Sequence, residues 1–182
     1  MNYCSHCGSS KLEFVIPKGD QFARFVCPNC QTIHYQNPNM VVGAIPVWKN
    51  KVLLAKRNIE PRKGFWNLPC GFLEMNETVE EGAIREVFEE TGSKIDLIKL
   101  HTVYNLPDAN QVYLIFVATM QNDIFNPTSE SSEVKLFSEH EIPWEEIAFS
   151  SNTFALTHFF DDLKTGNSKV NFGTFKKSKP FS

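Results

Sequence analysis

Acidic residues are concentrated in one short segment of this 182-residue chain. Seven of its 21 acidic residues lie within seventeen consecutive positions, and Arg85 is the only basic residue among them. Thr78 and Glu81 form the sequence pattern of a helix capping box, and Gly92 stands where a left-handed C-cap belongs. The sequence therefore predicts a strongly acidic helix over residues 78–91. The seven acidic residues are Glu74, Glu77, Glu80, Glu81, Glu86, Glu89 and Glu90.

Three of these glutamates, Glu86, Glu89 and Glu90, are three or four residues apart and share one face of the predicted helix. Like charges at these spacings destabilise a bare helix, so we expect something to offset their repulsion. One interpretation is a solvated acidic face with ordinary Glu–Arg ion pairs. The other is a site for a hard divalent cation, which prefers oxygen ligands. The neighbouring face is expected to pack into the core through Ala83, Ile84, Val87 and Phe88.

The spacing of the whole segment favours the metal interpretation. Gly71 is followed after five residues by Glu77, and after seven more by the run Arg85-Glu86-Val87-Phe88-Glu89-Glu90-Thr91-Gly92. This pattern resembles the Nudix box, G-x5-E-x7-R-E-U-x-E-E-x-G-U, in which U is an aliphatic residue. The one departure is Ser93 at the final U position, beyond the expected ligands.

This resemblance implies a loop–helix–loop that binds Mg²⁺ or Mn²⁺ against a diphosphate group. Glu86 and Glu90 match the main metal ligands, Glu89 matches an auxiliary ligand or a base, and the backbone of Gly71 matches the point where metal and phosphate meet. Glu77 and Arg85 match a structural pair. Such chemistry is physically reasonable, because cations neutralise a diphosphate and a carboxylate can orient or deprotonate the attacking water.

A further acidic residue is expected outside the box as the general base. Glu133 is the first choice and Glu130 the second, and the alternative that both are ordinary loop acids is equally well supported. Cys70, in the lead-in Leu68-Pro69-Cys70-Gly71, is expected to be a small packed residue rather than a nucleophile. Aromatic residues at four positions are candidates to stack on a nucleotide base or, alternatively, to belong to the core: Phe65, Phe72, Tyr104 and Tyr113.

The cysteines define a second predicted metal site. Cys4 and Cys7 form one Cys-x2-Cys pair, Cys27 and Cys30 form another, and nineteen residues separate the pairs. Two such pairs across a predicted hairpin provide four thiolates for one tetrahedral Zn²⁺. Residues 1–38 are therefore predicted to be a structural zinc ribbon, because so short a segment cannot build its own core.

The rest of the chain is predicted to form one mixed domain with a short tail. Strands are expected on both sides of the acidic helix and further helix near the end. Together with the resemblance, this order predicts an α/β (α+β) fold: a Nudix α/β/α sandwich over residues 39–165 behind a small N-terminal β zinc ribbon. Residues 166–182 contain lysines and no acidic residue, and are expected to be a basic, frayed C-terminal tail that Phe172, Phe175 and Phe181 pin in part.

Composition excludes several other classes of protein. The net charge of −3 lacks the basic footprint of a non-specific nucleic-acid binder, so a nucleic-acid partner is not expected. No apolar stretch approaches the roughly 20 residues of a membrane helix, and no secretory signal is visible, so a cytoplasmic protein is expected.

The ribbon narrows the resemblance to one part of the family. Tyr104-Asn105-Leu106-Pro107 followed by Gln111-Val112-Tyr113 is similar to the FAD/ADP-ribose pyrophosphatase branch. The predicted function is hydrolysis of the pyrophosphate bond in nucleoside diphosphate-X substrates, FAD or ADP-ribose favoured, with release of a nucleoside monophosphate. The alternatives are an NADH pyrophosphatase or RNA-cap deNADding hydrolase, whose Ser-Gln-Pro-Trp-Pro-Phe-Pro signature is missing, and a nucleotide sensor without turnover. Resemblance to the ADP-ribose branch also implies a homodimer.

Overall fold

The computed structural model describes residues 1–167 and 169–176, which divide into two compact units. The division falls between Asn37 and Pro38. The N-terminal unit is a three-stranded antiparallel sheet of β1 (Glu13–Val15), β2 (Arg24–Val26) and β3 (Ile33–His34). Its first turn closes where the Asp20 N–H donates to the Pro17 carbonyl, 3.0 Å away. This is the hairpin that was predicted between the two cysteine pairs.

The ribbon unit has almost no apolar interior. Cys4 and Cys27 are its buried apolar side chains, and Phe14, Ile16 and Phe22 are each more than 60% exposed. A unit of this size without a hydrophobic core usually needs a metal or disulfides to fold.

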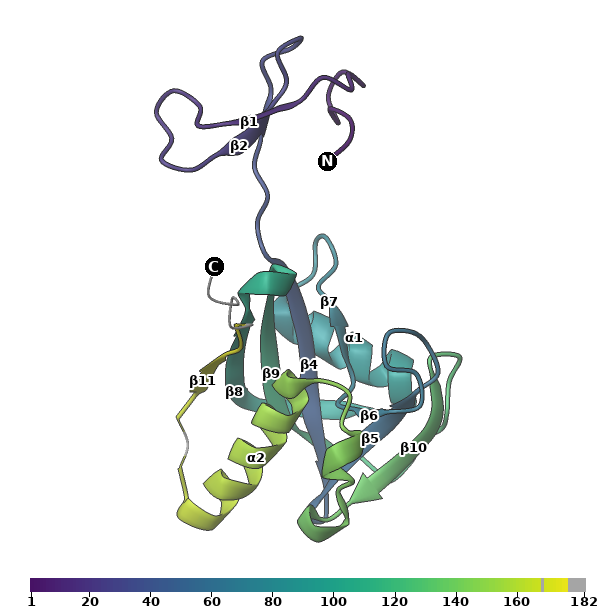
Figure 1. The fold of residues 1–182 in the computed structure, drawn as a ribbon. Helices are drawn as coiled ribbons and strands as arrows, with labels where there is room; N and C mark the ends of the chain where they lie inside the picture. Colours follow the sequence, from purple (N-terminus) through teal and green to yellow (C-terminus); the bar gives the residue numbers. More distant parts are fainter. Residues whose placement is uncertain (168, 177–182) are drawn as a thin grey trace. The chain divides into compact units, whose positions relative to one another are not determined.

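The second unit is built on one mixed sheet (Figure 1). Its strands are ordered β10-β5-β4-β9-β8-β11, and the short β6 and β7 pair with β5 and β4. Neighbours are antiparallel except for β4 with β9 and β8 with β11, which are parallel. The bounds are β4 (Asn39–Trp48), β5 (Lys51–Arg57), β6 (Trp66–Asn67), β7 (Cys70–Phe72), β8 (Ile95–Leu106), β9 (Gln111–Met120), β10 (Ser131–Phe137) and β11 (Asn171–Thr174).

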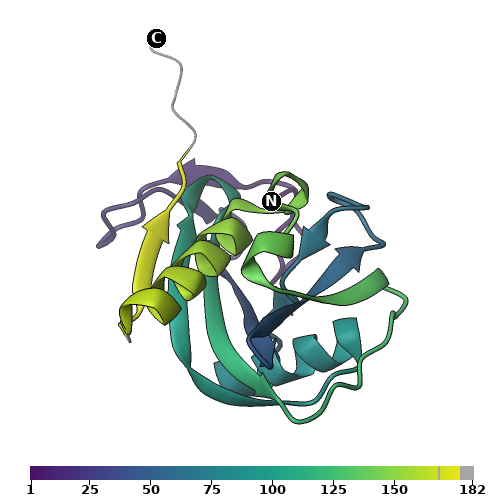
Figure 2. The ribbon, with the colours of Figure 1, turned by 90° about the horizontal axis from the view of Figure 1, so that it is seen from below.

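Alternating side chains give the sheet two apolar faces, each covered by one helix (Figure 2). On β4, Val42 and Ala44 pack with Ala83 and Val87 of α1 (Val79–Thr91), whereas Ile45 belongs to the cluster around α2 (Ser150–Thr165). The two faces and two helices make the predicted α/β/α sandwich. Short 3₁₀ turns complete the unit at Pro107–Ala109, Glu139–Glu141 and Trp144–Glu146.

Helix α1 begins and ends as predicted. Thr78 and Glu81 form the capping box, and Gly92 adopts the left-handed conformation, with φ of 68°. The predicted core face of this helix is wrong at two positions, because Ile84 is 40% and Phe88 is 52% exposed. The buried side of the helix instead carries Glu86 and Glu90 beside Ala83 and Val87.

The predicted frayed tail contains a strand. Residues 171–174 form β11 on the edge of β8, where Phe172 is paired in register with Val103 yet remains 74% exposed. Gly173 permits this close approach, because a Cβ there would lie 2.6 Å from Cδ2 of Tyr104. The predicted anchor Phe181 lies outside the described residues. Over the described part of the chain, neither helix is long and apolar enough to cross a membrane.

Candidate active site

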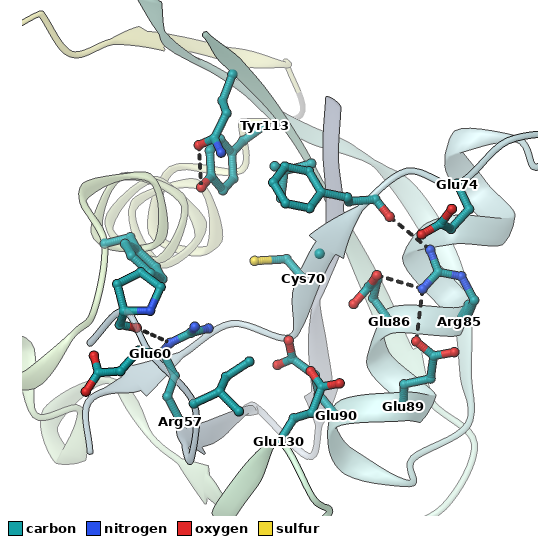
Figure 3. Close-up of a pocket in the computed structure, with 17 residues that line it drawn as sticks. Arg57, Glu60, Cys70, Glu74, Arg85, Glu86, Glu89, Glu90, Tyr113 and Glu130 are labelled. Atoms are coloured by element: carbon teal, nitrogen blue, oxygen red, sulfur yellow. Dashed lines mark hydrogen bonds and ion pairs between the residues drawn. The ribbon is translucent and has the colours of Figure 1, made fainter. Parts of the chain in front are cut away.

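The second unit contains a cavity of about 500 Å³ (Figure 3). Its walls come from three kinds of element: the strands β4, β5, β7 and β9, the acidic helix α1, and loops near residues 60, 74, 130 and 149. Six carboxylates and two arginines line it, so the cavity is strongly acidic. The lining residues are Val41, Arg57, Ile59, Glu60, Pro61, Cys70, Gly71, Phe72, Glu74, Arg85, Glu86, Glu89, Glu90, Gln111, Tyr113, Glu130 and Phe149.

Helix α1 brings Glu86, Glu89 and Glu90 to one wall of the cavity. Glu86 and Glu90 are buried, at 8% and 6% exposure, whereas the Glu89 side chain is half exposed. Burial, together with the negative charge of Glu86, raises the pKa of Glu90 to about 8. Burial likewise raises the pKa of Glu86. Two neighbouring buried carboxylates that resist ionisation are stabilised when a cation joins them.

Gly71 lies directly against Glu86. A Cβ at residue 71 would lie 2.4 Å from Oε2 of Glu86 and 2.5 Å from Oε1. Only glycine leaves the carboxylate in this position, which gives a steric reason for the glycine at the start of the predicted box.

Glu86, Glu89 and Glu90 form the acidic wall of the cavity, and Arg85 connects the first two of them to the loop before α1. Its Nη2 donates to Glu77, 2.7 Å away, and to the Phe72 carbonyl, and its Nη1 donates to Glu86 and Glu89 at 2.6 and 2.9 Å. The hydrogen bonds from Arg85, with the Glu74 N–H, lower the pKa of Glu77 to about 2. Arg85 therefore ties the loop before α1 to the helix, in agreement with the structural pair that the resemblance implied for Glu77 and Arg85.

The floor of the cavity is a row of side chains across three strands. Phe72 on β7 pairs in register with Val41 on β4, which pairs with Tyr113 on β9. Phe72 is 52% exposed, and the Tyr113 hydroxyl donates to Oε1 of Gln111, 3.2 Å away. Two of the predicted stacking residues, Phe72 and Tyr113, therefore line the cavity.

The other two aromatic candidates lie outside the lining. Tyr104 continues the same row on β8, but the Phe154 ring of α2 covers it at a centroid distance of 5.0 Å, and it is only 6% exposed. Tyr104 is therefore a core residue, the alternative considered for it from the sequence. Phe65 packs instead beneath the guanidinium of Arg62.

Of the two candidate bases, the structure brings only Glu130 to the cavity. Glu133, the first choice, is on β10 opposite Lys56, and its carboxylate lies 3.9 Å from the Lys56 Nζ with the side chain 51% exposed. A register shift between Ser131 and Glu133 precedes this pairing. The preference for Glu133 is thus corrected: it is a surface ion-pair residue, and Glu130 faces Glu86 and Glu90 closely enough to raise their pKa values further.

Several lining residues were not anticipated from the sequence. Arg57 at the end of β5, Gln111 at the start of β9 and Phe149 before α2 meet only because distant segments fold together. No local pattern marks Arg57 or Phe149, and Gln111 was noted only as part of the run that resembles the FAD/ADP-ribose branch. Cys70 is also in the lining, where burial raises its thiol pKa, as do the charges of Glu90 and Glu86. A thiol held neutral in this way is a poor nucleophile.

The acidic wall fits a divalent cation that substrate helps to bind. Its donors are hard carboxylate oxygens, and two of them are buried side by side. Among the described residues, however, only the cysteines bring three or more ligand atoms within 4.8 Å of one another, so the glutamates do not form a closed cage. Mg²⁺ typically uses one or two carboxylates, water and substrate phosphates, so an open acidic wall suits it.

The four ribbon cysteines fit Zn²⁺ closely. All four sulfur atoms lie within 4.8 Å of one another, and the Cys4–Cys30 and Cys7–Cys27 pairs are each 3.6 Å apart. Zn–S bonds of about 2.3 Å in a tetrahedron would separate the sulfurs by about 3.8 Å. His34 places its Nε2 3.3 Å from the Cys4 sulfur, where it supports a zinc ligand without being one of the four.

Family comparisons match both units. Residues 37–157 match the family described as "NUDIX domain", and residues 2–36 match the zinc-ribbon family described as "Nudix N-terminal". A crystal structure of a NUDIX hydrolase from Nitrosomonas europaea is 45% identical, with a TM-score of 0.92 over 97% of this chain and 100% of that one.

Two curated relatives carry more specific names. The ADP-ribose pyrophosphatase of Methanocaldococcus jannaschii is 34% identical over 60% of this chain and 67% of its own length. The NAD-capped RNA hydrolase NudC of Vibrio parahaemolyticus is 30% identical over 79% of this chain, but the match spans only 53% of that relative. The matches to both units and the full-length likeness to a solved family member establish that this chain belongs to the Nudix hydrolase family and carries the family's N-terminal zinc ribbon.

Proposed function

We propose that this protein hydrolyses the pyrophosphate bond of nucleoside diphosphate-X substrates, with FAD or ADP-ribose preferred, and releases a nucleoside monophosphate. The observation that carries the proposal is the acidic wall beside a cavity large enough for a nucleotide. Neighbouring buried carboxylates are stabilised by a bound divalent cation, and a cation held by only a few carboxylates can also coordinate substrate phosphates. The ADP-ribose pyrophosphatase relative supports the choice of substrate.

In this proposal Glu86, Glu89 and Glu90 hold Mg²⁺ or Mn²⁺, together with the backbone of Gly71. When bound, the cation neutralises the diphosphate and makes its phosphorus open to attack by water. Arg85 fixes Glu86 and Glu89 on α1, so that both carboxylates are oriented before substrate arrives. Glu130 faces the same space from another loop and is the candidate to accept the proton of the attacking water.

The nucleotide base of the substrate is proposed to lie on the floor of the cavity. Phe72 presents an exposed ring there for stacking, and the Tyr113 hydroxyl orients the Gln111 amide beside it. Since one hydrophobic or stacking contact discriminates by only about 1–3 kcal/mol, we expect activity on several related substrates.

A second candidate function is hydrolysis of NADH or of NAD-capped RNA. The observation that favours it is the longer match to NudC, which reaches 79% of this chain. A cytoplasmic location and a homodimer belong to the proposal as well. The free cysteines favour a reducing compartment, and light scattering of the purified protein tests the dimer.

The test is a hydrolysis screen over FAD, ADP-ribose, NADH and diadenosine polyphosphates at a fixed Mg²⁺ concentration, with products identified by mass spectrometry. We expect a nucleoside monophosphate among the products and the highest kcat/KM for FAD or ADP-ribose. A tenfold lead for NADH would favour the second candidate. No hydrolysis of any diphosphate at any Mg²⁺ or Mn²⁺ concentration would refute both.

A further inference from the structure

The loop before β10, which carries Glu130, is attached to the end of helix α1. The last carbonyls of an α-helix have no partner within the helix, so they need acceptor contacts from elsewhere. The Thr91 carbonyl accepts from the Asn126 N–H, 2.8 Å away. The Glu90 carbonyl accepts from Oγ1 of Thr128, 3.4 Å away. The loop is therefore bound to the same helical turn from which the Glu90 carboxylate projects.

Within this loop, the Thr128 side chain closes a tight turn. Its Oγ1 accepts from the Glu130 N–H, 3.2 Å away, and its backbone N–H donates to the Ser131 carbonyl at 3.0 Å. A threonine hydroxyl that accepts from the N–H two residues later is a common way to form a turn. Because a hydroxyl can donate and accept at the same time, the one Thr128 side chain links the backbone of Glu90 to the backbone of Glu130.

Asn58 holds the opposite side of the turn. It follows the last residue of β5, and its backbone N–H donates to the Glu130 carbonyl, 2.7 Å away. Its side-chain Nδ2 donates to the Ser129 carbonyl at 3.2 Å. Strand β10 begins at the next residue after Glu130 and pairs with β5. The backbone of Glu130 is thus fixed from α1 on one side and from β5 on the other.

The Glu130 carboxylate itself is left available. Over residues 1–167 and 169–176 it has no hydrogen-bond or ion-pair partner. Figure 3 shows it beside Glu90, and its charge adds to the effects of burial and of Glu86 that raise the pKa of Glu90. A general base must lie within hydrogen-bond reach of the water that it deprotonates, and an error of about 1 Å can cost about 10²-fold in rate. A carboxylate on a loop therefore depends on contacts that fix the loop.

We propose that Thr128 and Asn58 are positioning residues that set the place of the Glu130 carboxylate relative to Glu90. This inference rests on the proposed function, because it names the groups that hold the candidate base of that reaction. Neither side chain lines the cavity, so both act through Glu130 without touching the substrate. Thr128 has the larger role, because its hydroxyl makes two of the contacts, whereas the shorter contact of Asn58 comes from its backbone.

The test begins with single variants, assayed on the best substrate of the hydrolysis screen at saturating Mg²⁺. Thr128→Val keeps the side-chain shape but removes both hydroxyl contacts, and we expect kcat to fall by about ten- to thirtyfold with KM within about twofold. Thr128→Ser keeps the hydroxyl and should stay within about threefold of wild type. Asn58→Ala should lower kcat by about three- to tenfold. Thr119→Val, exposed on β9 and outside the lining, is the matched control and should not change kcat.

A double-mutant cycle with Glu130→Gln then shows whether Thr128 acts through Glu130. We expect Glu130→Gln to lower kcat by about 10²-fold, and the addition of Thr128→Val to cost less than about twofold more. The Mg²⁺ concentration for half-maximal rate should be the same in Thr128→Val and the wild type. Equal losses in both backgrounds, or kcat of Thr128→Val within about twofold of wild type, would overturn the inference. A rise in the Mg²⁺ requirement that accounts for the loss would also overturn it, because Thr128 would then act through Glu90.

The same measurements separate this inference from the proposed function. If the wild type is active but Glu130→Gln keeps kcat within about threefold, the proposed hydrolysis stands and Thr128 has no base to position. If the wild type hydrolyses no nucleoside diphosphate-X substrate, the proposed function fails and this inference fails with it. A loss in Thr128→Val that serine rescues, and that is absent in the Glu130→Gln background, is the result that supports it.

Discussion

The ribbon cysteines and the α1 carboxylates are both suited to metals, yet the protein around them is built in opposite ways. The cysteines lie in a unit whose buried apolar side chains are two of the cysteines themselves. The glutamates project from a capped helix whose buried side also packs Ala83 and Val87 against the large sheet. Zinc is therefore expected to hold the ribbon fold together, whereas the fold of the Nudix domain is expected to hold the carboxylates of α1 in place for the reaction. Metal binding is therefore expected to stabilise the fold in the ribbon and to support the reaction in the Nudix domain.

The largest expected effect is a loss of activity, without loss of stability, when a carboxylate of the acidic wall is replaced. Glu86→Gln and Glu90→Gln each remove a negative ligand with little change of size, and we expect each to lower the hydrolysis rate by about 10²–10⁴-fold. Because α1 is held by its caps and its apolar side, the thermal midpoint of the Nudix domain should not fall. Glu80→Gln, on the exposed part of the same helix, is the control and should remain near wild type. Activity of both cavity variants within a few-fold of wild type at saturating Mg²⁺ would exclude these residues from the mechanism.

The next effect comes from the glycine behind Glu86. In Gly71→Ala the new methyl group would lie within 2.5 Å of the Glu86 carboxylate and must displace it. We expect a loss of about ten- to a hundredfold in kcat, since an error of about 1 Å in a reacting group can cost that much. Steady-state kinetics and a melting curve check this. Unchanged kcat would mean that the position of Glu86 is not critical.

In the ribbon, loss of a metal ligand is expected to affect the fold first. Cys27→Ser removes a buried thiolate ligand, and we expect the unit 1–37 to lose its protection in hydrogen exchange while the strands of the Nudix domain keep theirs. Metal analysis of the wild type should find about one Zn²⁺ per chain. Wild-type protein with a protected ribbon and no zinc would contradict this role for the metal.

The smallest effect concerns a polar group buried in the Nudix domain. His101 lies between β8 and α2, its Nε2 is 3.1 Å from the Ala155 carbonyl, and burial lowers its pKa. The unfolded state therefore takes up a proton below about pH 6.5 that the folded state resists, so stability should decrease as the pH falls through that range. Denaturant melts of wild type and His101→Gln at pH 7.5 and pH 5.5 measure this. The wild type should lose more stability than the variant, and equal losses would assign the pH dependence to other groups.

Local features of this fold could be predicted from the sequence, and contacts between distant segments could not. The caps of α1 and the hairpin turn at Lys49 and Asn50, both with positive φ, depend on residues close together in the chain. The direction in which α1 faces the sheet depends on its tertiary contacts. Apolar spacing pointed to Ile84 and Phe88 for the core, whereas the helix turns Glu86 and Glu90 inward.

The candidate site divides in the same way. The spacing of the box brought Gly71, Glu86, Glu89 and Glu90 into one prediction, and all four line the cavity. The sequence placed Glu130 and Glu133 together before a predicted strand and could not decide between them, because only the register of β10 against β5 shows that Glu133 pairs with Lys56. The residues at the far side of the cavity, Arg57 among them, come from segments up to 92 positions away in the chain (Arg57 to Phe149) and leave no joint pattern in the sequence.

The most direct test of the division between the two metal sites is a chelation and add-back experiment on the whole chain. Metal-free protein is divided in two: one part receives Mg²⁺ alone and the other Zn²⁺ alone. ADP-ribose hydrolysis and hydrogen exchange of residues 1–37 are then measured in each. We expect Mg²⁺ to restore hydrolysis while the ribbon stays unprotected, and Zn²⁺ to restore protection of the ribbon without hydrolysis. Hydrolysis restored by Zn²⁺ alone, or ribbon protection restored by Mg²⁺ alone, would contradict the assignment of one metal to the fold and the other to the reaction.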